Sequence, residues 1–249
     1  MHPILLADGT QTMPGQLLSE TEDVKKMIAW ATGKFKRVID LGAGEGGYAV
    51  AFVRAGFDVM AVEAREENCE KIHAADKRVV ILRMTVEEYL QYHYDPTPKD
   101  TLILCLGLLY HLKHPADVLN AITKKCSGMI LSTHYALDSH WQYDIGGVGS
   151  WILKRFYKRF PKLFKNNHYG LSKMTVSYGR RGRWYPEYHP FDPKEKTDKL
   201  THSSFHNHRS FWLTSEDIFK IPYENGCPSV WGRIRESNQN ILAYFERKE

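Results

Sequence analysis

Short apolar runs and helical patterns alternate along the first half of the chain. The apolar runs cover residues 37–41, 57–62, 79–82, 101–106 and 128–132. Between them, apolar positions recur at helical spacing over residues 48–55, 66–75, 86–92 and 116–125. Five strands joined by four helical crossovers predict a parallel sheet that is covered on both faces. Because such crossovers are right-handed, the pattern favours a doubly wound α/β fold.

The two ends of the chain add further elements. Ser19 and Glu22 have the spacing of a capping box and predict the start of a helix. Near the C-terminus, Thr214 is expected to cap a helix that ends at Glu224. Two more apolar runs follow, at residues 229–234 and 240–247. The short turn between these runs predicts an antiparallel pair of strands.

The periodicity fails beyond the fifth strand. Residues 138–210 are rich in Gly, Tyr, Trp, His, Lys and Arg, and they are too numerous for an ordinary connection. We therefore expect an inserted lid subdomain at 138–210, within a core formed by residues 1–137 and 211–249. The pattern of the lid predicts one helix at 150–164 and one strand at 173–178.

Composition excludes several classes of protein. The 249 residues are 43% hydrophobic and 25% charged, which is ordinary for a globular chain and unlike a disordered or fibrous one. No apolar run approaches the ~18 residues of a membrane span, and no basic start precedes an apolar stretch as in a secretory signal. The four cysteines show no CxxC spacing, so a cytoplasmic location is expected. No pattern predicts an oligomeric state.

The positive charge of the chain is concentrated in one segment. Residues 145–186 contain ten lysines and arginines and no acidic residue, whereas the whole chain has a formal net charge of +5. The rest of the chain is therefore net acidic. The basic character belongs to the predicted lid and is a local feature.

The first apolar run ends in a glycine-rich loop. Residues 42–47 (Gly-Ala-Gly-Glu-Gly-Gly) satisfy the GxGxxG pattern, and Glu63 follows at the distance typical of a carboxylate that binds ribose hydroxyls. Asp40 and Glu45 flank the loop and would repel the pyrophosphate of a dinucleotide. They suit a cationic nucleotide ligand such as S-adenosylmethionine (SAM). The alternative is that both carboxylates merely cap the helix and face solvent.

These residues carry a resemblance to a known family. Residues 40–46 (Asp-Leu-Gly-Ala-Gly-Glu-Gly) and 62–65 (Val-Glu-Ala-Arg) resemble class I SAM-dependent methyltransferases. The resemblance implies a Rossmann-like sheet of seven strands, six parallel and one antiparallel, with SAM as cofactor and S-adenosylhomocysteine (SAH) as product. It implies that the cofactor is bound by Asp40, Gly42, Ala43, Gly44, Glu45, Glu63, Ala64, Thr85, Val86 and Leu106. The sequence departs from the family at Thr85-Val86, where many members have an Asp beside the adenine.

A narrower resemblance covers the segment after the fourth strand. Residues 107–115 (GLLYHLKHP) are similar to a Gly-x-Leu-Tyr-His segment of the tRNA wobble-uridine carboxymethyltransferase-like group. Natural-product and glycan methyltransferases share that segment, and residues 210–214 (SFWLT) also resemble the group. The lid does not match the tRNA enzymes. The resemblance therefore indicates a subgroup and not a substrate.

Three residues at the carboxyl ends of strands are candidates for catalysis. His111 and Tyr110 follow the fourth strand, and His134 ends the fifth. Ligands of open α/β sheets bind at those ends, and a hydroxyl or amine acceptor can require a general base. We predict His111 as the base, with Tyr110 and His134 as further catalytic candidates. The alternative is that His111 is held by backbone groups and only positions its loop.

The lid supplies candidates for substrate binding. Arg180, Arg181 and Arg183 suit an anion because guanidinium groups fit phosphate and carboxylate. Glu187 lies among aromatic residues and is a second candidate base. The predicted substrate-binding residues are Arg180, Arg181, Arg183, Trp184, Glu187, His206, Asn207 and Arg209. The histidines at 202, 206 and 208 lack accompanying Cys or clustered acids, so no metal site is expected.

The helix predicted at 150–164 has an apolar face and a cationic face. Three interpretations remain open for it: packing on the core, recognition of an anionic substrate, or contact of residues 150–165 with a membrane surface. For the whole chain, we predict methyl transfer from SAM to a hydroxyl of a polar, anionic small molecule or glycan. The alternatives are an RNA acceptor, especially tRNA, and a SAM-binding partner protein without catalysis.

Overall fold

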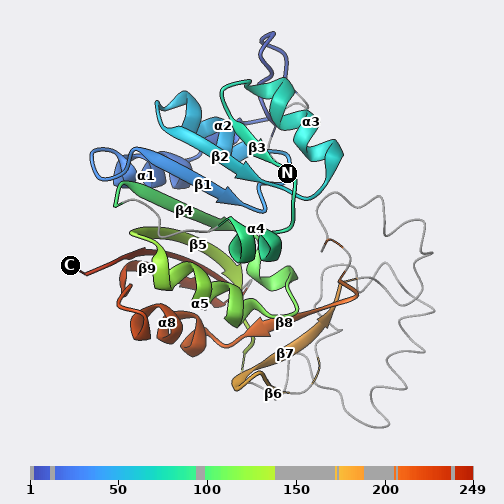
Figure 1. Cartoon of the computed structure of the whole chain (residues 1–249), viewed down its shortest axis with the longest axis vertical. Helices are drawn as coiled ribbons and strands as arrows, with labels where there is room; N and C mark the ends of the chain where they lie inside the picture. The colour runs from blue at the N-terminus through green and yellow to red at the C-terminus, as the bar shows by residue number, and fades with distance from the viewer. Residues whose placement is uncertain are drawn as a thin grey trace.

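A central sheet of seven strands organises the computed structural model, which describes residues 3–11, 15–93, 99–137, 172, 174–187, 205, 207–236 and 239–248 (Figure 1). In spatial order its strands are β3 (Val80–Leu82), β2 (Asp58–Val62), β1 (Arg37–Leu41), β4 (Thr101–Leu106), β5 (Gly128–His134), β10 (Asn240–Glu246) and β9 (Ser229–Arg235). All five strands predicted in the first half of the chain are present. The order reverses between β1 and β4, which is where doubly wound sheets bind ligands.

Six strands of this sheet run in one direction and β10 runs against them. The pairs β3–β2, β2–β1, β1–β4 and β4–β5 are parallel, whereas β10 is antiparallel to both β5 and β9. The predicted count of six parallel strands and one antiparallel strand is therefore confirmed. The antiparallel pair predicted near the C-terminus is β9 and β10.

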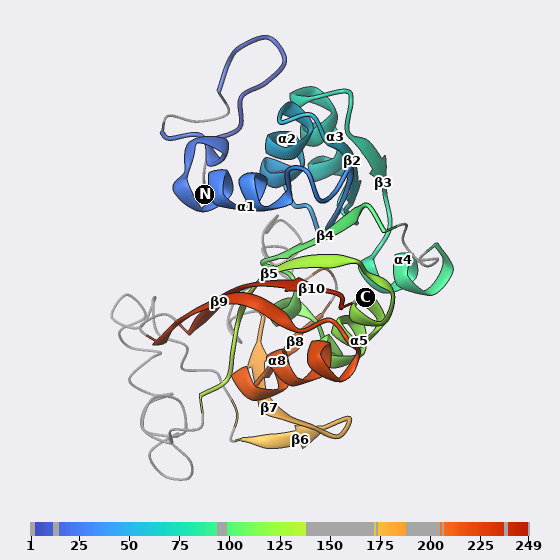
Figure 2. The ribbon, with the colours of Figure 1, turned by 90° about the vertical axis from the view of Figure 1, so that its left-hand side faces the viewer.

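Helices cover both faces of the sheet (Figure 2). One face carries α1 (Glu22–Ala31), α2 (Gly47–Arg54) and α3 (Glu66–Ala75). The other face carries α4 (Val86–Tyr92), α5 (Pro115–Lys125) and α8 (Ser215–Glu224). Strand β4 shows why its sequence is a continuous apolar run: Leu102 and Leu104 pack on the first face, and Ile103 and Cys105 pack on the second.

The helix caps agree with the sequence at one end of the chain and differ at the other. Thr214 caps α8 as predicted, because its hydroxyl accepts a hydrogen bond from the Asp217 amide at 3.2 Å. The capping box predicted at Ser19 is wrong. A 3₁₀ turn occupies Leu18–Glu20, and α1 begins at Glu22 with Thr21 as its cap.

A second, smaller sheet lies beside the core. It contains β6 (Thr175–Ser177), β7 (Arg180–Pro186) and β8 (Arg209–Leu213), and each neighbouring pair is antiparallel. β6 corresponds to the strand predicted at 173–178, whereas β7 was not predicted. Tyr178 and Gly179, both with positive φ, form the two-residue turn between them.

This sheet extends across the predicted boundary between lid and core. β8 crosses residue 210 and leads directly into α8, so that its C-terminal end is continuous with the core. The helix predicted at 150–164 lies outside the described residues, and the division into lid and core stays a prediction. No described helix is long and apolar enough to cross a membrane.

Candidate active site

Two glycines of the loop between β1 and α2 combine a positive φ with a position where a Cβ atom would be crowded. Gly42 has a φ of +67°, and a Cβ atom there would lie 2.9 Å from Leu108. Gly46 has a φ of +85°, and a Cβ atom there would overlap the side chain of Ile72. L-residues rarely adopt these angles. The loop after β1 therefore packs directly against Leu108, in the segment that follows β4.

Glu63 follows β2 and is fixed against the same loop. Its Oε2 accepts a hydrogen bond from the Gly44 amide at 2.7 Å, and its Oε1 accepts one from the Arg65 amide at 2.8 Å. The residue is 7% exposed. A carboxylate has more acceptor positions than these two bonds use. Glu63 is therefore held rigidly while it retains acceptor capacity for a ligand.

Asp40 is a buried carboxyl group close to Glu63. It is 2% exposed and lies in β1 between Ala61 of β2 and Leu104 of β4. Burial raises the pKa of Asp40 to about 7; a hydrogen bond from the Ala49 amide opposes this shift, and the charge of Glu63 adds to it. Its Oδ2 has no hydrogen-bond partner among the described residues. A buried carboxyl group in this state favours a cationic ligand.

The other predicted cofactor residues lie in the loops and helix starts that follow strands β1 to β3, or at the end of β4. Glu45 forms an ion pair with Lys71 of α3, with Oε1 and Nζ 2.5 Å apart. Thr85 caps α4 in a capping box with Glu88, so its hydroxyl is engaged within the helix turn. The remaining predicted residues border the same edge of the sheet: Ala43, Ala64, Val86 and Leu106.

His111 and Glu187 form a hydrogen-bonded pair at the end of β4. His111 lies in the 3₁₀ turn η2 (Leu109–His111), and Glu187 follows β7. Nδ1 of His111 and Oε2 of Glu187 are 2.8 Å apart, with side-chain exposures of 21% and 2%. An ionised Glu187 can only accept a hydrogen bond, so with this partner Nδ1 of a neutral ring donates and the lone pair lies on Nε2. The structure thus joins two candidate bases into one unit.

Tyr110 and His134 belong to an aromatic cluster next to this pair. The cluster contains Tyr110, His134, Tyr185 and Trp212, with ring centroids 4.5 Å apart for Tyr110–His134 and 5.2 Å for His134–Trp212. Nδ1 of His134 lies 3.2 Å from the Gln239 carbonyl oxygen. Burial, together with the charge of Glu187, raises the pKa of Tyr110 to about 12. The Tyr110 phenol therefore stays protonated near neutral pH and can donate a hydrogen bond.

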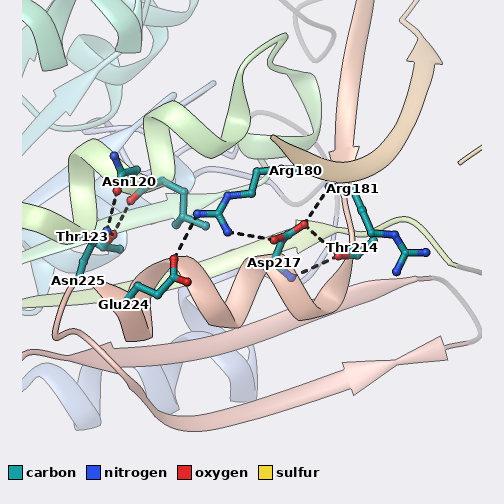
Figure 3. Close-up of polar contacts among 9 residues, drawn as sticks. Asn120, Thr123, Arg180, Arg181, Thr214, Asp217, Glu224 and Asn225 are labelled. Carbon is teal, nitrogen blue, oxygen red and sulfur yellow. Dashed lines mark hydrogen bonds and ion pairs between the residues drawn. The ribbon is translucent and has the colours of Figure 1, made fainter. Parts of the chain in front are cut away.

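The predicted arginine cluster is divided among different partners. Arg180 pairs with Asp217 and Glu224 of α8, at 3.2 Å in both cases (Figure 3). Arg183 is fully buried and donates to the carbonyls of Leu137 and Ser172, at 3.0 and 2.9 Å. Arg181 has an exposed side chain. Two of the three guanidinium groups thus hold the second sheet in place, and their predicted role in substrate binding stays untested.

The other predicted substrate residues are spread along β7, β8 and their flanks. Trp184 packs against Phe211, with centroids 5.1 Å apart. Asn207 donates from Nδ2 to the His111 carbonyl at 3.3 Å. Arg209 is exposed at the start of β8, and His206 lies outside the described residues.

Two features of the site were missed in the sequence. Tyr48, at the start of α2, has its pKa raised to about 12 by burial and by the charge of Asp40. The guanidinium carbon of Arg65 lies 5.3 Å from the ring centroid of Phe205. The position of Tyr48 directly after the glycine loop could have identified it. Nothing in the sequence links Arg65 to Phe205.

The doubly wound sheet, the acidic glycine loop and Glu63 together define the class I methyltransferase fold. A family model described as a methyltransferase domain matches residues 16–211 of the sequence, which is more than half of the chain. The chain therefore belongs to the methyltransferase-domain family. No curated protein matches the sequence.

Solved structures with the same fold include several methyltransferases. The N-terminal domain of EvdMO1, solved with SAH and D-fucose, is 20% identical with a TM-score of 0.60, over 97% of this chain and 88% of that one. The 1,6-didemethyltoxoflavin-N1-methyltransferase of Burkholderia thailandensis is 13% identical with a TM-score of 0.52, over 94% and 80%. The magnesium protoporphyrin IX methyltransferase of Synechocystis PCC 6803 is 14% identical with a TM-score of 0.52, over 95% and 90%.

Proposed function

We propose that this methyltransferase takes its methyl group from SAM and transfers it to a hydroxyl of a polar small molecule or glycan. The His111–Glu187 hydrogen bond carries the proposal. A hydroxyl is a weak nucleophile while it keeps its proton, so such an acceptor needs a base close to the methyl donor. The anionic character of the acceptor, the RNA alternative and the non-catalytic alternative remain predictions from the sequence.

The residues at the β1–β2 edge suit SAM. Asp40 and Glu63 would face a ligand that carries an ammonium group and a sulfonium, and Glu63 would also accept from ribose hydroxyls. When bound, SAM supplies an electrophilic methyl group. Relatives of the same fold have been solved with SAH, which supports this choice of cofactor.

His111 would act on the acceptor from the neighbouring strand end. Its Nε2 would take the proton of the acceptor hydroxyl as the oxygen–methyl bond forms and the methyl–sulfur bond breaks. The Glu187 carboxylate, at 2.8 Å from Nδ1, would orient the ring and stabilise the resulting imidazolium. Because Leu108 packs on the glycine loop, the base would lie next to the cofactor. Such positioning supplies much of the rate enhancement of a displacement reaction.

The test uses SAM labelled on its methyl group. The full chain is incubated with labelled SAM and a cell lysate, and the products are separated into RNA, lipid, protein and small-molecule or glycan fractions. Label in hydroxyl-methylated small molecules or glycans is the expected result. Label confined to RNA would refute the small-molecule assignment and support the RNA alternative.

Variants with a matched control test the roles of His111 and Glu63, which follow the carboxyl ends of β4 and β2. His111→Gln is expected to lower transfer about a hundredfold with SAM affinity retained, since general bases typically contribute 10²–10⁴-fold. His73→Gln, on an exposed turn of α3, is the control and should transfer at the wild-type rate. Glu63→Gln is expected to weaken SAM binding in calorimetry. Wild-type transfer by His111→Gln would remove the base from the proposal.

A further inference from the structure

His111 and Glu187 lie far apart in the sequence. Two consecutive residues, Asn207 and His208, form hydrogen bonds with their main chains. Asn207 donates from its side-chain amide to the His111 carbonyl at 3.3 Å. The next residue, His208, accepts at its carbonyl from the Glu187 amide at 3.1 Å. Residues 207–208 therefore contact the main chain of both the imidazole residue and the carboxylate residue.

Strand β8 continues this contact along the turn that carries His111. The indole of Trp212 donates to the Tyr110 carbonyl at 3.0 Å, and the Phe211 amide donates to the Leu112 carbonyl at 2.8 Å. Three consecutive carbonyls, at residues 110, 111 and 112, thus accept hydrogen bonds from residues 207–212. A single 3₁₀ turn has few internal hydrogen bonds and relatively poor geometry, so these outside donors determine where its backbone lies.

We propose that Asn207 is a positioning residue that holds His111 so that its ring meets Glu187. The proposal rests on the proposed function, in which His111 is the base. The sequence made Asn207 a candidate for substrate contact. In the structure its amide instead donates to the backbone of the base residue, and the neighbouring carbonyl fixes the carboxylate residue. Catalytic groups need placement to within about 0.5 Å. The hydrogen bond from the Asn207 amide to the His111 carbonyl would restrict the backbone of His111 in this way.

The consequence of losing this amide falls on the tautomer of His111. With the turn held, Nδ1 carries the proton that is shared with Glu187, and Nε2 carries the lone pair. With the turn released, the 2.8 Å contact is populated less of the time, and the neutral ring is no longer confined to one tautomer. A role in stability alone would leave the tautomer of the folded protein unchanged.

The experiment reads the two ring nitrogens of His111 directly. The full chain is labelled with ¹⁵N-histidine, long-range ¹H–¹⁵N spectra are recorded from pH 6 to pH 9, and His111→Gln identifies the resonances. Asn207→Ala is expected to move the two nitrogen shifts toward each other, in the same direction as Glu187→Gln. Asn207→Gln, which keeps a donor, is expected to recover part of the wild-type shift.

The matched control is a half-buried side-chain amide at the end of α8 that contacts neither His111 nor Glu187 through the hydrogen bonds of its side chain. Asn225 donates from Nδ2 to Asn120 and Thr123, both at 2.9 Å, at the end of α8 (Figure 3). Asn225→Ala removes two side-chain hydrogen bonds, against the one removed by Asn207→Ala, and is expected to leave the His111 nitrogen shifts unchanged. Wild-type nitrogen shifts in Asn207→Ala would overturn the proposal.

Kinetics with the acceptor identified by label transfer give a second readout. Asn207→Ala is expected to lower kcat about tenfold, the effect of losing one hydrogen bond, with KM for the acceptor within about twofold of wild type. Combined with Glu187→Gln, it should add less than about a twofold loss, because both act through one pair. A raised KM with unchanged kcat would make Asn207 a substrate contact and overturn the positioning role. Wild-type transfer by His111→Gln would refute the role of His111 as a base. The nitrogen shifts would still show whether Asn207 positions the His111 ring.

Discussion

The buried carboxyl of Asp40 should make SAM binding depend on pH. Its pKa is raised from 3.8 to about 7, so about one-tenth of the groups are ionised at pH 6 and about three-quarters at pH 7.5. If the ionised form binds the cationic cofactor, SAM affinity rises about eightfold over this window. Isothermal calorimetry at several pH values measures the change. In Asp40→Asn the affinity should be low and flat over the same range.

The same group should reduce the stability of the protein without ligand. A folded-state pKa above the unfolded value gives a stabilising contribution that is present below pH 3.8 and is lost as pH rises through about 7. The shift of about 3 units corresponds to about 4 kcal/mol at pH 8. Asp40→Asn removes this penalty but leaves an amide that lacks a partner, at a cost of about 1–3 kcal/mol.

We therefore expect Asp40→Asn to bind SAM poorly and yet to unfold at a higher temperature than wild type at pH 8. A net gain of about 1–3 kcal/mol corresponds to a rise of a few degrees in Tm for a chain of this length. Thermal melts at pH 5 and pH 8, with and without SAM, test both parts. A lower Tm than wild type at pH 8, or SAM affinity in wild type that is equal at pH 6 and pH 7.5, would refute the reasoning.

Three further predictions concern the scaffold. Gly46→Ala should cost about 3 kcal/mol of stability because of its positive φ and the overlap of the new Cβ atom with Ile72. Gly44→Ala, with positive φ in open space, should cost about 1 kcal/mol. Equal melting temperatures of the two variants would contradict this. Arg247→Ala should cost about 2 kcal/mol in urea unfolding, since its guanidinium donates to three carbonyls at 2.5–3.2 Å. Arg180→Gln should lower stability by about 0.5–1 kcal/mol with methyl transfer unchanged, and a raised KM for the acceptor would instead assign it to substrate binding.

The core of the fold could be predicted because its pattern is local. Each strand of the parallel sheet is an apolar run bounded by glycine or polar residues, and each crossover helix has its own period. β7 was not predicted because its sequence (Arg-Arg-Gly-Arg-Trp-Tyr-Pro) is rich in cations and has no alternation of apolar and polar residues. The strand forms through its hydrogen-bonded pairing with β8, which the local sequence does not reveal. The N-cap of α1 is Thr21 and not Ser19, because a 3₁₀ turn includes Ser19. No residue pattern predicts this turn.

The sequence could nominate residues for the candidate site, but it could not predict which of them contact one another. His111 and Glu187 were each proposed as a base, yet nothing in the sequence sets the distance between positions 76 residues apart. The arginines of β7 were interpreted as an anion site because residues 145–186 contain no acidic residue. The acids that pair with Arg180 come from α8, which lies later in the chain. Long-range pairing of charges is decided by tertiary structure, so composition alone overestimates the free charge of such a segment.

The carboxylate of the His–Glu pair follows β7, while the imidazole belongs to the core. Under the proposed function, any exchange of the segment between β5 and α8 during evolution would therefore exchange the carboxylate that orients the proposed base. A descendant with a new segment lacking an acid at this place would keep the cofactor end of the sheet intact. It would lose proton abstraction until another acid evolved. If the same segment binds the acceptor, as the sequence predicts, acceptor choice and activation of the acceptor would be inherited together.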